Sequence, residues 1–114
     1  MSIEELQHIC EQFKGVTQDI KWESHLCFNV GQKMFLVTLP DGFPHTASFK
    51  TTNEYFEELC NREGIIPAPY LARHQWVHLD DINRLSRIEW EKYIRISYEL
   101  VYDKLPSKLK KEIV

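Results

Sequence analysis

Three capping-box motifs mark where helices begin in this chain. In each motif a serine or threonine precedes a glutamate by three residues, so that side chains and backbone can bond reciprocally at a helix start. The motifs are Ser2 with Glu5, Thr51 with Glu54, and Ser86 with Glu89. Because apolar residues follow each motif at helical spacing, the sequence predicts three amphipathic helices. They run from about Ile3 to Lys14, from Thr51 to Gly64 and from Ser86 to Leu105.

Strand patterns lie between the first two helices. After a connection through Asp19 that we expect to be polar and irregular, His25 to Val30 alternates polar and apolar residues. That alternation is typical of a half-buried strand. The run from Met34 to Leu39 is apolar on both faces and predicts a central strand covered on two sides. His45 to Lys50 predicts a third strand, and short turns containing glycine would join the three as an antiparallel meander.

The segment Gly64 to Leu79 contains two prolines, which cannot continue a helix, and it predicts a further strand from about His74 to Leu79. The resulting order is helix, three strands, helix, strand and long helix. It predicts an α+β fold, a two-layer sandwich whose antiparallel sheet is packed by helices. The length, 114 residues, suits a single domain over residues 1–114. Pro106 should end the long helix, and Ser107 to Val114 should add one helical turn.

Composition excludes several classes of protein. No apolar run approaches the ~18 residues of a membrane span, and the acidic N-terminus lacks the pattern of a signal peptide, so we expect a cytoplasmic protein without membrane contact. The three cysteines form no CxxC pair, which predicts reduced thiols and no zinc site. The net charge of −3 argues against a strong nucleic-acid binder. Residues 71–114 nevertheless carry a net charge of +2, from 9 basic and 7 acidic side chains, so an anionic partner would prefer this part.

We expect no catalytic, metal or cofactor site. His74 and His78 would lie ~13 Å apart on one strand, too far to share a metal ion. The exposed carboxylates of the first helix are commonplace surface groups. Cys27 is the one thiol expected to face outward, near His25, but no third catalytic group or oxyanion turn accompanies the pair. Because no glycine-rich phosphate loop is present either, the sequence predicts that the protein is not an enzyme.

Four pieces of the chain are similar to the MmcQ/YjbR family of small bacterial domains. These pieces are Gly31 to Phe35, Ser48 to Thr51, Pro67 to Trp76, and Ser97 to Val101 together with Lys104 to Pro106. The resemblance implies a fold like that of the frataxin homologue CyaY, and it implies DNA binding through a double-wing arrangement. Fold alone does not determine function. The family tends to have a histidine directly before the tryptophan, and this chain has Gln75 there, so a titrating imidazole is not available at that position.

Five residues form the candidate binding surface, and they are Lys50, Tyr70, Arg73, His74 and Trp76. Cations can contact phosphates and aromatic rings can stack on bases, so this mixture suits weak, unspecific DNA binding. In the competing interpretation Trp76 fills the core, and Arg73 pairs with Glu23, Asp80 or Asp81. The alternative function is a protein-interaction domain without nucleic-acid binding or catalysis, recognisable by an exposed apolar patch near Tyr70 and Trp76. In either case we expect a monomer.

Overall fold

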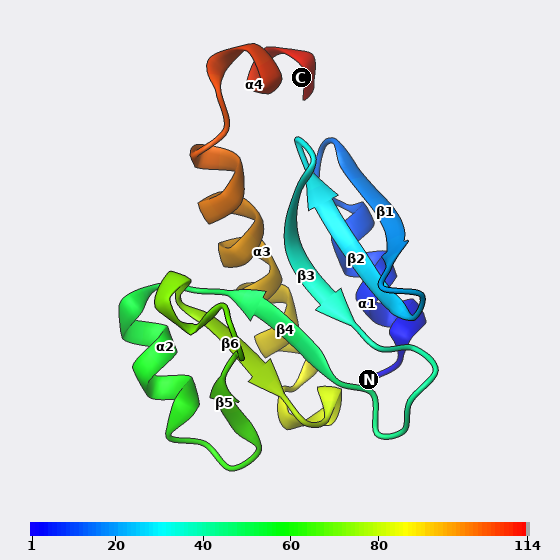
Figure 1. The fold of residues 1–114 in the computed structure, drawn as a ribbon, viewed down its shortest axis with the longest axis vertical. Coiled ribbons are helices and arrows are strands. Elements are labelled where there is room, and N and C mark those ends of the chain that lie inside the picture. The colour runs from blue at the N-terminus through cyan, green and yellow to red at the C-terminus, as the bar shows by residue number, and fades with distance from the viewer. Residues whose placement is uncertain (114) are drawn as a thin grey trace.

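The structure, a computed structural model, describes residues 1–113 (Figure 1). Six strands form one sheet in the order β1-β2-β3-β4-β6-β5, and every neighbouring pair is antiparallel. The strands are β1 (Val16–Lys21), β2 (His25–Val30), β3 (Lys33–Thr38), β4 (Ala47–Lys50), β5 (Ile65–Pro67) and β6 (Trp76–Leu79). The helices are α1 (Ile3–Glu11), α2 (Asn53–Cys60), α3 (Arg87–Asp103) and α4 (Ser107–Ile113), with short 3-10 helices η1 (Ala72–His74) and η2 (Ile82–Arg84).

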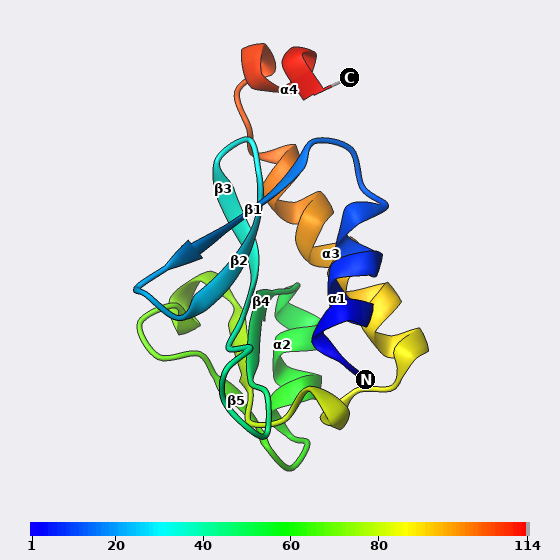
Figure 2. The same ribbon diagram turned by 90° about the vertical axis from the view of Figure 1, so that its right-hand side faces the viewer.

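The helices cover one face of the sheet. In Figure 2, α1 and α3 lie side by side against it, and α2 packs near β5 and β6. Large apolar side chains from both layers form a continuous core, with Phe28, Phe49 and Trp90 completely buried within it. Burying both apolar faces against each other is what stabilises such a sandwich. The predicted two-layer α+β fold is therefore confirmed.

Helix starts agree with the capping motifs at two of three positions. Ser86 and Glu89 form the complete capping box of α3, and the Ser2 hydroxyl accepts a hydrogen bond from the Glu5 amide at 3.1 Å. The prediction for α2 was wrong by one residue, because Thr52 rather than Thr51 caps that helix. The amide of Thr51 instead bonds the Gln75 carbonyl at 2.9 Å, which keeps Thr51 in line with the sheet. The helices α1 and α2 also end three to four residues earlier than predicted.

Two strands were missed. The segment Val16–Lys21, predicted as an irregular connection, is the edge strand β1, and each of its residues pairs with β2. The short strand Ile65–Pro67 forms the opposite edge, where a proline is tolerated because one side of the strand has no partner. The strand predicted from His74 begins at Trp76, since His74 belongs to η1. His74 and His78 are thus not on one strand.

The burial of strands β2 and β3 also differs from the prediction. β2 is buried on both faces from Leu26 to Val30, and Asn29 on this strand donates a hydrogen bond to Asp19 of β1 at 2.8 Å. The half-buried prediction for this strand was wrong. β3, predicted to be covered on both faces, has half-buried Met34 and Val37 on the face away from the helices.

The tail forms a helix, which is about two turns long where a single turn was predicted. α4 occupies seven residues at one end of the molecule (Figure 1), and the Lys110 ammonium donates a hydrogen bond to the Asp103 carbonyl at 2.9 Å. Val114, the last residue of the predicted tail, is outside the described residues. Within residues 1–113, no helix is both long and apolar enough to cross a membrane.

Candidate functional site

The candidate site begins where strands β3 and β4 separate. They pair at only three positions, the last of which is Leu36 with Phe49. In the same register the next pair would be Phe35 with Lys50. At this point the Ser97 hydroxyl of α3 donates to the Phe35 carbonyl at 2.6 Å and accepts from the Lys50 amide at 3.1 Å. A side chain of the helix thus takes the place of a direct bond between the strands, and the strands diverge beyond it.

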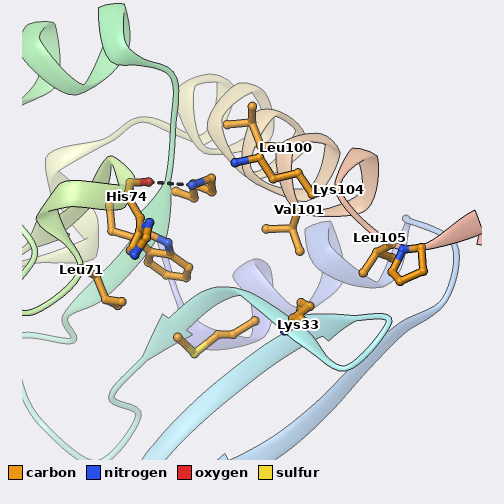
Figure 3. Close-up of a pocket in the computed structure, with 11 residues that line it drawn as sticks. Lys33, Leu71, His74, Leu100, Val101, Lys104 and Leu105 are labelled. Carbon is orange, nitrogen blue, oxygen red and sulfur yellow. Dashed lines mark hydrogen bonds between the residues drawn. The ribbon is translucent and has the colours of Figure 1, made fainter. Parts of the chain in front are cut away.

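A groove of about 490 Å³ lies at this divergence (Figure 3). Its lining comes from the start of β3, the end of β4, the segment before β6, and the C-terminal part of α3 with the residues that follow. The lining residues are Lys33, Met34, Lys50, Leu71, His74, Trp76, Leu100, Val101, Lys104, Leu105 and Pro106. Because Ser97, Leu100, Val101 and Lys104 follow helical spacing, one face of α3 both holds the strands apart and lines the groove.

The groove combines an apolar floor with three cations. Lys33, Lys50 and Lys104 come from three different elements, and no lining residue is acidic. Among the described residues, the ion pairs involve Arg62, Arg84 and Arg87 and none of the groove lysines. The chain as a whole carries a net charge of −3, so this is a local concentration of unneutralised positive charge. Such a surface favours an anionic ligand.

Lys50 is the most constrained of the three cations. It is half-buried, and its ammonium donates a hydrogen bond to the His74 carbonyl at 2.7 Å, drawn as a dashed line in Figure 3. Burial lowers the pKa of Lys50, and the nearby positive charge of Lys104 lowers that pKa further. Both effects disfavour the charged ammonium. A negative charge close to the Lys50 ammonium would act in the opposite direction and favour its charged form.

The predicted surface residues divide into exposed and buried ones. Tyr70 is 99% exposed, and Arg73 and His74 are exposed beside it, but Trp76 is only 5% exposed. Trp76 therefore packs, as the competing interpretation held, and cannot offer an open ring for stacking. The expected ion pairs of Arg73 are not formed, and Asp80 instead binds Arg84 at 2.8 Å.

Tertiary contacts hold the exposed segment in place. Tyr70 and Gln75 both have positive φ angles, 66° and 60°, a conformation that residues other than glycine rarely adopt. The backbone at Gln75 and His74 is held by the bond from the Thr51 amide to the Gln75 carbonyl and by the bond from the Lys50 ammonium to the His74 carbonyl. The end of β4 thus fixes the segment that borders the groove.

The cysteine thiols of β2 and α1 are buried, and the possible metal-binding side chains of the described residues are not clustered. Cys27, expected to face outward, is completely buried, and burial raises the pKa of its thiol. The reason is that its strand, β2, is covered on both faces. Cys10 is also fully buried, in agreement with its place on an apolar helix stripe. Residues 1–113 contain no group of three or more His, Cys, Asp or Glu side chains arranged to hold a metal ion.

Ser48 and His78 form a cross-strand pair that the sequence did not reveal. They are register partners on β4 and β6, and the Ser48 hydroxyl lies 2.8 Å from Nδ1 of His78. Burial lowers the pKa of His78 from its usual 6.5, although the carboxylate of Asp80 acts in the opposite direction. The neutral imidazole is therefore favoured in the folded protein.

This pair predicts a pH effect on stability. Because the folded-state pKa of His78 is lowered, the unfolded chain binds more protons, and stability should fall as the pH drops below 6.5. Urea unfolding between about pH 5 and 7 should show this slope, above the range where Asp80 and Glu89 titrate. The His78→Gln variant should show a flatter profile. An equal slope in both proteins would contradict the assignment.

The sequence indicated part of this groove and missed the rest. Lys50, His74 and Trp76 were candidates and do border it, whereas Lys33, Lys104 and Ser97 were not. All three lie in the pieces that carry the family resemblance, and this was the only signal for them. Their proximity depends on contacts between residues far apart in the chain, such as Ser97 with Phe35.

The fold and the groove together define a small α+β protein that has a cationic groove with an apolar floor. The chain belongs to the YjbR family, whose family model matches residues 11–100. A Deinococcus radiodurans protein with a DUF419 domain is similar in structure, with a TM-score of 0.86, 23% identity, and coverage of 98% of this chain and 87% of that one. A Pseudomonas syringae protein is similar with a TM-score of 0.70 and 18% identity, over 89% of this chain and 99% of that one. No curated protein matches.

Proposed function

We propose that this protein is a non-catalytic domain that binds nucleic acid weakly through the groove and the exposed segment beside it. The observation that carries the proposal is the convergence of Lys33, Lys50 and Lys104 on a groove whose lining contains no carboxylate. Phosphates are the anions that a nucleic acid presents repeatedly, and lysines contact them without regard to sequence. Arg73, which is exposed, extends the cationic surface toward Tyr70.

Each group has a distinct part in this binding. The lysines would neutralise phosphates. Burial and the charge of Lys104 both lower the pKa of Lys50, and a phosphate bound between Lys50 and Lys104 would act in the opposite direction by favouring the charged ammonium. The exposed ring of Tyr70 can stack on a base, a contact that buried Trp76 cannot make. Because phosphate contacts position a nucleic acid without reading its bases, the protein should discriminate little between sequences.

The test is salt-dependent binding of a labelled oligonucleotide, measured by fluorescence anisotropy. Three phosphate contacts should give a slope of roughly −2 to −3 in log affinity against log salt. The double variant Lys33→Gln/Lys104→Gln removes two exposed groove cations and should weaken binding by roughly tenfold or more at low salt, with a shallower slope.

The matched control is Lys108→Gln/Lys111→Gln, which removes the same charge from exposed positions on α4. It should leave affinity within about threefold of the parent protein, because neither lysine lines the groove and neither should contact a phosphate bound there. Binding that does not respond to salt would overturn the proposal. So would an equal loss in the two double variants, which would point to net charge alone.

The second candidate function is protein interaction, and one observation favours it. The predicted apolar patch near Tyr70 is not available, since Trp76 is buried and cations lie beside it. One of the two edges of the sheet, however, is strand β1, where Ile20 and the following Trp22 are 57% and 66% exposed. An unpaired edge strand can accept an added strand from a partner. A stoichiometric protein partner retained after nuclease treatment, and lost in Ile20→Lys, would support this function.

A further inference from the structure

The groove has a feature that phosphate binding alone does not use. Below the lysines, its floor is formed by apolar side chains, of which Met34, Leu100 and Val101 are only half-buried. Figure 3 shows Lys33 and Lys104 on opposite sides of the groove, with Val101 between them. A ligand that covers apolar surface inside a concavity removes that surface from water, and this contributes favourably to its binding free energy. The occupant should therefore be anionic at its edges and apolar at its centre.

A double helix does not match this arrangement. Its bases are stacked and paired, so it would offer phosphates to the rim and nothing flat and apolar to the floor. An unpaired strand presents both its phosphates and the faces of its bases, and stacked or packed bases contribute substantially to single-strand binding. The volume of about 490 Å³ lies within the range of roughly 300–1,000 Å³ found for small-ligand pockets, which suits one nucleotide unit.

The lining of the groove is suited to a flat ring. Met34 is unbranched and adaptable, so it can follow the outline of different bases. Trp76 is the register partner of Lys50, so a largely buried aromatic ring and a cation lie side by side at one wall. With Lys33 on the β3 side and Lys104 on the α3 side, cations surround the floor where the backbone of a strand would cross.

We propose that the groove receives one unstacked base of a single-stranded nucleic acid on its apolar floor, while Lys33, Lys50 and Lys104 hold the neighbouring phosphates. This inference rests on the proposed nucleic-acid binding and names the form of nucleic acid. The protein would distinguish unpaired strands from paired strands, and it would not distinguish one base sequence from another.

The test compares three probes of equal length at one salt concentration. They are an oligothymidylate, a duplex, and a strand of abasic sugar-phosphate units that retains every phosphate. The protein should bind the oligothymidylate about tenfold more tightly than either of the other two, in keeping with the contribution of one packed base. Trp76 borders the groove, so its fluorescence can report on a base bound there. The measurement uses the Trp22→Phe variant, which lacks the emission of the exposed Trp22 indole. The fluorescence of this variant should change with the oligothymidylate only.

A floor variant separates the base contact from the phosphate contacts. Met34→Gln/Val101→Thr keeps side-chain size and net charge, and it should remove most of the preference for the oligothymidylate while leaving duplex binding unchanged. Ile88→Gln, a change at a residue that is 80% exposed outside the groove, should have no effect. Equal, salt-dependent binding of all three probes would overturn this inference and leave the proposed function intact. Binding of none of them would overturn both.

Discussion

The Trp90→Ala variant is expected to lose roughly 4–5 kcal/mol of unfolding free energy, the largest effect of any single change considered for this chain. Trp90 is completely buried, and its ring packs against Phe49 with centroids 5.6 Å apart. Its indole N–H also donates to the Ile82 carbonyl at 2.7 Å in the buried core. Alanine would leave a cavity and an unpaired carbonyl together. Because small domains have only about 5–15 kcal/mol of stability, the variant should be close to unfolding.

Urea unfolding followed by circular dichroism measures this effect. Trp90→Phe retains most of the ring volume and loses the hydrogen bond, so it should lower the unfolding free energy by about 1–3 kcal/mol. Comparison with Trp90→Ala then separates the contribution of packing from that of the hydrogen bond. Trp22→Ala is the matched control within the chain, because Trp22 is 66% exposed and should change stability by about 0.5 kcal/mol or less. Similar losses for Trp22→Ala and Trp90→Ala would contradict the placement of the core.

The Ser97→Ala variant is expected to lose roughly 2–4 kcal/mol, although only one oxygen atom is removed. The hydroxyl is fully buried and bonds both the Phe35 carbonyl and the Lys50 amide. Without it, two backbone groups at the divergence of β3 and β4 lose their partner. The loss should appear in urea unfolding and as faster hydrogen exchange at the Lys50 amide.

Ser107→Ala is the control for this change, because Ser107 is exposed at the first position of α4, and it should be nearly neutral. If the Lys50 amide remained fully protected in Ser97→Ala, the strands would have closed and paired directly. That result would contradict the role of Ser97 in holding the groove open.

The local parts of the fold were predictable because their causes are local. The Ser86 and Glu89 capping box begins α3, and the apolar spacing that follows it predicts the face that is buried. β1 was missed because Thr17, Gln18 and Asp19 carry no apolar alternation, and what makes this segment a strand is its ladder with β2. The boundary at Thr52 likewise depends on a distant partner, since Gln75 holds the amide of Thr51.

The amino-acid sequence by itself determined the family, the α+β class, the main helices and the candidate residues Lys50, His74 and Trp76. Only the tertiary structure decided that Trp76 is packed, that Ser97 separates two strands, and that Lys33 and Lys104 join Lys50 around one groove. The physical reason is the range of the interactions involved. Caps and periodicity act within a few residues, whereas the groove exists because a helix hydroxyl bonds a carbonyl 62 residues away and keeps two strands from pairing.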